Sequence, residues 1–154
     1  MEIHSRSEEQ TACMAEGLAK LLKPGDLVFL IGQLGAGKTC FIRYAAKALG
    51  IREPVTSPSF TMAQTYSGVI RVHHLDLYRL SSFSAEDAID FEEFFEKDAV
   101  TFIEWPERAE PFIEEPDVIV RLEHVDLNSR RISIESSNDR LAGRLEQLHA
   151  NTGH

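Results

Sequence analysis

The chain has 154 residues, 43% of them hydrophobic, and a formal net charge of −9. This length is typical of one domain with one core, so we expect a single domain over residues 1–154 with a frayed end from about residue 150. The acidic balance disfavours direct binding of nucleic acid, which rewards clustered lysine and arginine. The two cysteines form no disulfide or zinc pattern, and no apolar run approaches 18 residues, so we expect a cytoplasmic protein without a membrane segment.

The first predicted element is an amphipathic helix that begins after Ser7. Ser7 and Gln10 have the spacing of a capping box, and the Pro-Gly-Asp sequence at residues 24–26 ends the helix. Four apolar residues fall on one face of this helix: Met14, Leu18, Leu21 and Leu22. The helix either packs only against the core or also brings Glu8 or Thr11 close to a nucleotide base.

The apolar run Leu27–Ile31 predicts a strand that is buried on both faces. Residues 32–39, GQLGAGKT, then match G-x-x-x-x-G-K-[ST] at every specified position, and a helical pattern follows that ends at Gly50. In a P-loop of this kind, glycines let backbone N–H groups surround a β-phosphate at the positive end of a helix. The flanking strand and helix disfavour a chance match.

The P-loop predicts roles for individual residues in binding the phosphates of a nucleotide and Mg²⁺. Lys38 is expected to reach the β- and γ-phosphate oxygens, and Thr39 to bind Mg²⁺ through its hydroxyl group. The other predicted nucleotide-binding residues are Gly32, Leu34, Gly35, Ala36, Gly37 and Cys40. The Cys40 side chain itself is most simply a small buried group.

Residues 55–61 are rich in hydroxyl groups around one proline, which predicts a loop between the helix and two strands at residues 61–66 and 69–75. Its hydroxyl groups either only form the hydrogen bonds of an ordinary turn, or the segment is a switch loop whose Thr61 contacts the γ-phosphate or Mg²⁺. Asp76 directly follows the second strand, at a position where a carboxylate can hold Mg²⁺ or its bound water. The histidines at residues 73–74 face opposite sides of that strand and cannot chelate one metal ion together.

A further helix is predicted at residues 84–95, followed by a buried strand at residues 99–103. Segment 86–98 carries seven acidic residues and one lysine, and we expect the acids on the outside, as a solvated face or as a surface for a basic partner. The apolar side of the helix is formed by Ile89, Phe91, Phe94 and Phe95. Glu104 follows the buried strand directly, in the position of a Walker B carboxylate, and Trp105 either stacks on a ring or is structural.

The last third of the chain predicts two strands, residues 117–124 and 131–136, and a closing helix at residues 138–149. Together these elements predict an α/β protein with the P-loop NTPase fold. Its single domain would contain a mainly parallel sheet flanked by helices, with antiparallel hairpin elements.

Four motifs resemble those of TsaE, a family of bacterial ATPases required for the synthesis of threonylcarbamoyladenosine in tRNA. They are GQLGAGKT at 32–39, TSPSFT at 56–61, HLDLYRL at 74–80 and IEWPE at 103–107. The resemblance extends over nearly the whole chain in length and motif order. Gln33 and Ser59 depart from the usual aspartate and threonine of the family, and neither change removes a phosphate-binding group.

The resemblance implies slow, Mg²⁺-dependent hydrolysis of ATP by a protein that works with two partner proteins. One partner is the enzyme that transfers threonylcarbamoyl to an adenosine beside the tRNA anticodon, and the other is its dimerisation partner. Contact with tRNA would then be indirect. Thr39, Glu104 and Asp76 are the predicted metal ligands, and the predicted catalytic residues are Lys38, Asp76, Glu104 and Thr61.

Two other classes of protein share parts of this pattern. A small-molecule P-loop kinase has a similar loop and size but needs several arginines on a lid, and the region between the P-loop and Glu104 has only Arg43, Arg52, Arg71 and Arg79. A nucleotide-dependent switch would bind without needing hydrolysis. A GTPase switch is disfavoured because the sequence lacks the Asn-Lys-x-Asp motif that recognises guanine.

Overall fold

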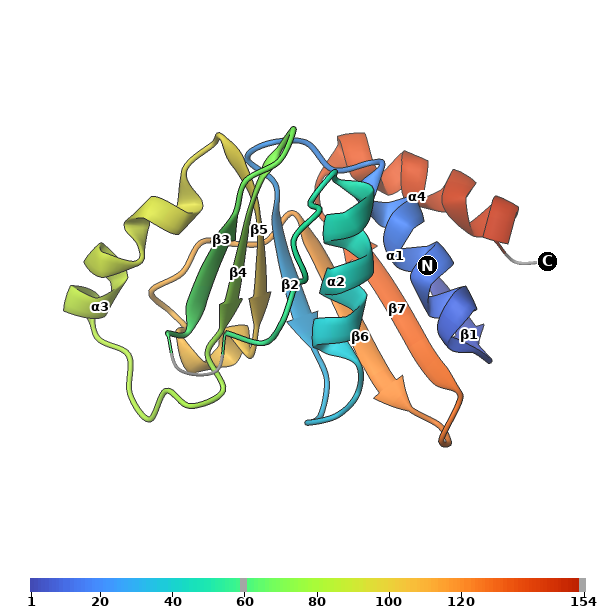
Figure 1. Cartoon of the computed structure of the whole chain (residues 1–154), viewed down its shortest axis with the longest axis horizontal. Helices are drawn as coiled ribbons and strands as arrows, with labels where there is room; N and C mark the ends of the chain where they lie inside the picture. Colours follow the sequence, from blue (N-terminus) through green and yellow to red (C-terminus); the bar gives the residue numbers. More distant parts are fainter. Residues whose placement is uncertain (59–60, 153–154) are drawn as a thin grey trace.

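The computed structural model describes residues 1–58 and 61–152, so Ser59, one of the departures from the resembled family, lies outside the described residues. Seven strands form one sheet in the order β1-β7-β6-β2-β5-β4-β3 (Figure 1). The strands are β1 (Glu2–Ser5), β2 (Leu27–Ile31), β3 (Ala63–Tyr66), β4 (Arg71–Asp76), β5 (Ala99–Glu104), β6 (Val118–His124) and β7 (Arg130–Ser136).

The sheet is mixed: the predicted parallel strands and antiparallel hairpin elements are both present, but parallel pairs do not predominate as expected. Strands β4, β5, β2 and β6 run parallel to one another, whereas β3 pairs antiparallel with β4, and β7 pairs antiparallel with both β6 and β1. Tight turns join β3 to β4 and β6 to β7, and such turns can connect only antiparallel neighbours. The four parallel strands nevertheless all end at one edge of the sheet, and that edge carries the site described below.

The helices cover the two faces of the sheet unequally. They are α1 (Glu8–Ala19), α2 (Lys38–Ala48), α3 (Ala85–Asp90) and α4 (Asp139–Thr152), with short 3₁₀ helices η1 (Glu92–Phe95) and η2 (Pro106–Arg108). Helices α1, α2 and α4 contribute to the larger core, over one face. The smaller core on the other face is completed by aromatic residues that flank α3, by those of η1 and by Trp105 after β5. None of the helices in the described residues is long and apolar enough to cross a membrane.

Helix α1 begins where the sequence predicts. The Ser7 side chain accepts a hydrogen bond from the backbone N–H of Gln10, as a capping residue does, but the Gln10 amide accepts from the N–H of Arg6 rather than of Ser7. The helix ends at Ala19, so the predicted apolar positions Leu21 and Leu22 belong to the following turn.

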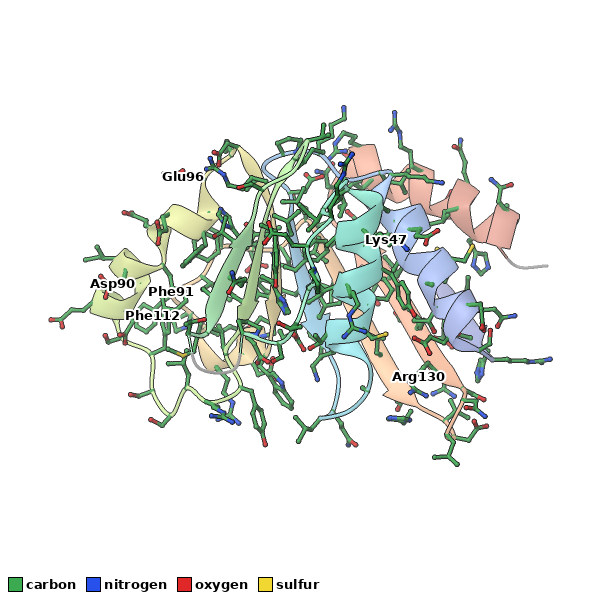
Figure 2. All side chains as sticks on the ribbon, viewed as in Figure 1. Lys47, Asp90, Phe91, Glu96, Phe112 and Arg130 are labelled. Carbon is green, nitrogen blue, oxygen red and sulfur yellow. The ribbon has the colours of Figure 1, made fainter. Side chains whose placement is uncertain are left out.

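The acidic segment is exposed, as predicted. Asp90 and Glu96 lie on its outer side, whereas Phe91 turns inward against the smaller core (Figure 2). Ile89 was expected on the apolar side and is instead 67% exposed, because α3 is only six residues long and is succeeded by a 3₁₀ turn that changes the helical phase.

Two features of the termini differ from the sequence prediction. Strand β1 has no predicted counterpart, since a four-residue edge strand carries too short a pattern to detect and depends on pairing with β7. Helix α4 continues to Thr152, beyond the predicted end at residue 149. Residues 153–154 of the predicted frayed end lie outside the described residues.

Replacing Arg140 with alanine should destabilise the fold by about 3 kcal/mol, because the buried carboxylate of Asp26 would lose its positively charged partner. Nη2 of Arg140 lies 2.7 Å from both carboxylate oxygens of Asp26, which is 7% exposed, and so ties α4 to the start of β2. Urea unfolding measures the loss. The matched change Arg144→Ala, at an exposed position of α4, should alter stability little, and equal losses in the two variants would contradict this role.

Candidate functional site

A glycine-containing loop, residues 32–37, joins the end of β2 to the start of α2 and is called the glycine loop below. Gly32 and Gly37 show why this loop contains glycine. A Cβ atom on Gly32 would lie 2.5 Å from the backbone oxygen of Leu122, and Gly37 has a φ of 102° in the left-handed region. The loop therefore passes close to β6 and turns sharply into α2, whose N-terminal N–H groups face the same space.

The β6–β7 hairpin holds the glycine loop from the side. Nε2 of His124 lies 2.7 Å from the backbone oxygen of Gly35, and Nε of Arg130 donates to the oxygen of Ala36 over 3.1 Å. These contacts fix two carbonyl groups of the loop in its present conformation. The sequence did not predict a role for either residue, although two adjacent arginines at residues 130–131 mark the turn. The hairpin and the glycine loop lie far apart in the sequence, so no short motif indicates that they are in contact.

Lys38, the first residue of α2, is only 4% exposed. Its Nζ donates to the carbonyl oxygens of Gly32, at 2.5 Å, and Gln33, at 3.0 Å, and lies 4.4 Å from the centre of the Trp105 ring. Burial lowers the pKa of Lys38, and the negative charges of Glu104 and Asp76 oppose that shift in part. The ammonium group is thus a desolvated cation, which is an arrangement that suits an anionic ligand.

Thr39 and Glu104 come together although 65 residues separate them. The Thr39 hydroxyl donates to Glu104 at 3.1 Å from Oε1 and 2.9 Å from Oε2. The Glu104 carboxylate is 3% exposed and its Oε2 also lies 2.6 Å from Nε2 of His74, on the neighbouring strand. His73 faces the other side of β4, as predicted, where its Nδ1 contacts the Thr65 hydroxyl.

Asp76 lies directly across from Glu104 in the β4–β5 register. The carboxylate of Asp76 accepts a hydrogen bond from the Ser57 hydroxyl at 3.1 Å, and both residues line a hollow of about 330 Å³. Lys38 and Thr39 line the same hollow. Residues of the predicted phosphate and metal site therefore meet in one place.

Thr61 is not brought to this hollow. Its hydroxyl donates to the backbone oxygen of Ala63 at 2.9 Å, within its own turn. Ser57 from the same hydroxyl-rich loop occupies the position next to Asp76 instead. Sequence reasoning identified the loop but not which of its hydroxyl groups reaches the site, since four of them share one short segment.

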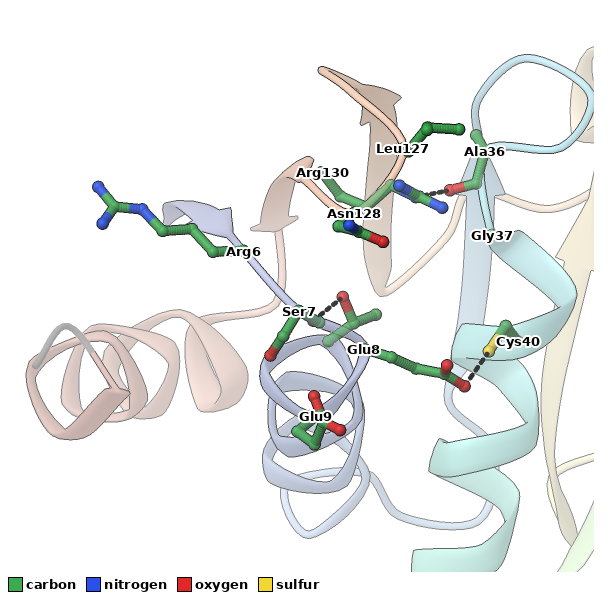
Figure 3. A pocket seen from close by; sticks show the side chains of 11 residues that line it. Arg6, Ser7, Glu8, Glu9, Ala36, Gly37, Cys40, Leu127, Asn128 and Arg130 are labelled. Carbon is green, nitrogen blue, oxygen red and sulfur yellow. Dashed lines mark hydrogen bonds between the residues drawn. The ribbon is translucent and has the colours of Figure 1, made fainter.

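A second cleft, of about 540 Å³, opens on the other side of the glycine loop (Figure 3). It lies between the start of α1, the start of α2 and the β6–β7 turn. Its lining includes the predicted nucleotide-binding residues Glu8, Thr11, Ala36, Gly37 and Cys40, together with the unpredicted residues Leu127, Asn128 and Arg130. Gly37 and Cys40 border both hollows, so the cleft and the phosphate-side hollow are neighbours.

Glu8 links the two helices across this cleft. Its carboxylate accepts hydrogen bonds from the Tyr44 hydroxyl and, at 3.8 Å, from the Cys40 thiol. The bond to Glu8 raises the pKa of Tyr44, and burial raises that of Cys40, with Glu8 adding to the effect. The Cys40 thiol is therefore not activated as a nucleophile. The Thr11 hydroxyl is engaged by Ser5, 2.7 Å away.

The donor set of the hollow suits a hard cation that shares its ligands with a phosphate. No group of three or more histidine, cysteine, aspartate or glutamate side chains that could hold a metal by itself occurs in residues 1–58 and 61–152. The Thr39 hydroxyl and the two facing carboxylates, Glu104 and Asp76, are oxygen donors of the kind that Mg²⁺ uses when water and phosphate complete its shell.

The fold and this site define a class: a single α/β domain in which a glycine loop precedes a helix and two carboxylates end adjacent parallel strands. Comparison with known families gives a match over residues 5–132 to the family described as threonylcarbamoyl adenosine biosynthesis protein TsaE. The chain belongs to the TsaE family. The resemblance found in the sequence motifs is thereby confirmed.

Individual relatives agree with this assignment. The chain is 37% identical to the tRNA threonylcarbamoyladenosine biosynthesis protein TsaE of Treponema pallidum over 87% of this chain and 99% of that protein. It is 38% identical to the protein of the same name from Aquifex aeolicus, over 86% and 94% of the two chains. Its fold is similar to the crystal structure of Bacillus subtilis YdiB, with a TM-score of 0.81, 28% identity and coverage of 98% and 95%.

Proposed function

We propose that the protein is a P-loop ATPase that binds ATP with Mg²⁺ and serves the threonylcarbamoyladenosine modification of tRNA. The observation that carries this proposal is the buried Lys38 at the start of α2, beside the Thr39–Glu104 contact. A desolvated cation, the N-terminus of a helix and a hydroxyl–carboxylate pair supply what a Mg²⁺–triphosphate needs. The phosphates would occupy the hollow in front of Lys38, and the base and ribose the cleft beside Glu8 and Thr11.

The side chains have separable tasks in this proposal. Lys38 would hold the β- and γ-phosphate oxygens, while Thr39 and Glu104 would hold Mg²⁺, whose charge would stabilise the transferred phosphoryl group. Asp76 orients the attacking water, aided by the Ser57 hydroxyl bound to its carboxylate. Thr61 remains a predicted γ-phosphate sensor, a role that would require its hydroxyl group to leave the backbone oxygen of Ala63.

Membership of the family supports a role in a tRNA-modifying complex. The protein acts with the threonylcarbamoyl transferase and the dimerisation partner of that enzyme, and contacts tRNA only through them. A net charge of −9 supports this division of labour, because the phosphate backbone of tRNA would be repelled by an isolated acidic chain.

A small-molecule kinase is the less favoured alternative. Such an enzyme closes arginines from a lid over the phosphates. Of the four arginines between the glycine loop and Glu104, Arg43 borders the hollow and donates to the carbonyl of Val55, while Arg71 pairs with Asp98 at the opposite end of β4 and β5. Assays that couple ATP turnover to candidate small-molecule acceptors separate the two functions.

The partner requirement is tested by a pull-down of the transferase and its partner subunit with tagged protein. We expect retention with Mg²⁺–ATP and reduced retention without nucleotide. The variant Lys38→Ala serves as the control that lacks productive nucleotide binding. Retention that is equal with and without ATP would contradict an ATP-dependent role in the complex.

Adenine should be preferred over guanine, since the chain has no Asn-Lys-x-Asp motif. The measurement is the thermal stabilisation of the protein by ATP and by GTP at matched concentrations with Mg²⁺, because each ligand stabilises according to its own affinity. ATP should give the larger increase in melting temperature. Equal increases would show that the cleft does not discriminate between the two bases.

A further inference from the structure

The buried histidine of β4, His74, has no task in the function proposed above. Its side chain is fully buried, and its Nε2 lies 2.6 Å from Oε2 of Glu104. An ionised carboxylate only accepts hydrogen bonds, so Nε2 of His74 is the donor. This bond joins the ends of neighbouring parallel strands directly behind the predicted metal ligand.

The other nitrogen of the ring makes the arrangement unusual. Nδ1 of His74 has no hydrogen-bond partner, and it is the only buried side-chain nitrogen or oxygen atom without one among residues 1–58 and 61–152. Leaving a buried polar atom unpaired opposes folding, and in native proteins such an atom calls for an explanation. Stability of the sheet alone does not explain it, because an apolar side chain would fill this position without the cost.

Glu104 shows what the bond to His74 does. Within the described part of the chain, Oε2 accepts from both His74 and Thr39, whereas Oε1 accepts only from Thr39 at the edge of the hollow. With Oε2 held from behind, the carboxylate cannot rotate freely about its last bond. Oε1 is thus kept on the side of Thr39, where a cation shared with the phosphates would lie.

We infer that His74 is a positioning residue that orients Glu104 for Mg²⁺ and thereby sets the affinity of the site for the metal. The inference rests on the proposed function and adds a residue to it. Partners of metal ligands that do not touch the metal themselves commonly alter metal affinity by about 10- to 100-fold when they are removed.

The test compares His74→Phe, which keeps the ring volume but cannot donate, with His74→Gln, whose amide nitrogen can reach the position of Nε2. Calorimetry measures ATP affinity over a Mg²⁺ series and without Mg²⁺. We expect H74F to raise the Mg²⁺ concentration required by about 10- to 100-fold while nucleotide affinity without Mg²⁺ is unchanged. H74Q should recover most of the loss, and His73→Phe, on the opposite face of β4, should match the wild type.

The outcomes separate this inference from the function on which it rests. An unchanged Mg²⁺ series in H74F, or an equal loss in H74F and H74Q, overturns the positioning role and leaves ATP binding intact. A wild-type protein without Mg²⁺-dependent ATP binding overturns both. A second test uses the wild-type protein and so does not depend on whether a variant folds. Nitrogen-15 spectra of its histidine side chains should show that the His74 ring carries its hydrogen on Nε2. A His74 ring that carries hydrogen only on Nδ1 would contradict the hydrogen bond to Glu104.

Discussion

Replacing Lys38 with alanine should abolish measurable ATP binding while the protein remains folded. Lys38 is 4% exposed, and the carbonyl oxygens of Gly32 and Gln33 are its hydrogen-bond acceptors in the described residues. Its positive charge faces the hollow, where the β- and γ-phosphates would be its principal partners. Without this buried cation, the charge of the phosphates would lack its main compensating group in the hollow.

The substitution Lys38→Ala should affect the stability of the fold differently from ATP binding. Burial lowers the pKa of Lys38, so the folded state binds this proton less tightly than the unfolded chain does, and the charged lysine opposes folding near neutral pH. Its removal is therefore not expected to unfold the protein. Calorimetry at constant Mg²⁺ and thermal unfolding measure the two properties, with Lys47→Ala, an exposed lysine of the same helix (Figure 2), as the matched control. Wild-type ATP affinity in K38A refutes the assignment of the phosphate site.

Replacing Asp76 with alanine should lower the rate of ATP hydrolysis by about 10²–10⁴-fold, the range for loss of a group that orients or deprotonates water. ATP affinity should change far less, because a residue that acts only in the transition state spares ground-state binding. Glu104→Ala should instead weaken the Mg²⁺ dependence of binding. The two acids face each other across β4 and β5, but only Glu104 contacts the Thr39 hydroxyl.

Single-turnover hydrolysis and ATP affinity, measured for each variant across a Mg²⁺ series, separate the two carboxylates. Asp98→Ala is a matched control, since this exposed acid lies at the opposite end of β5. Loss of Mg²⁺-dependent binding in D76A together with its retention in E104A would show that the roles are reversed. Identical Mg²⁺ titrations of the two variants would indicate joint binding of the metal.

The sequence predicted the local part of this site well. The strand Leu27–Ile31 and the helix that begins at Lys38 and stops before Gly50 lie where their patterns indicated. Short-range rules govern these elements: an apolar run, a glycine motif and a left-handed glycine after the helix, with φ of 90° at Gly50. Asp76 and Glu104 were predicted at strand ends for the same reason.

Contacts between distant segments were not predictable from a single sequence. The bond between His74 and Glu104 depends on β4 and β5 being parallel neighbours in one register, and the contact of Arg130 with Ala36 depends on the course of a hairpin 94 residues further along the chain. The mixed character of the sheet has the same origin, because strand pairing is a property of the fold rather than of any short segment. Ser57 was missed because neighbouring hydroxyl groups offer equivalent local patterns.

The central claim, that ATP binds with its phosphates in front of Lys38, can be tested by one titration. Trp105 is the single tryptophan of the chain, and its ring centre lies 4.4 Å from Nζ of Lys38, so its fluorescence reports on this site alone. Titration of Mg²⁺–ATP should give a saturable change in tryptophan fluorescence, with the same midpoint as calorimetric binding, and K38A should show none. Calorimetric binding of ATP without any change in Trp105 fluorescence would contradict the account.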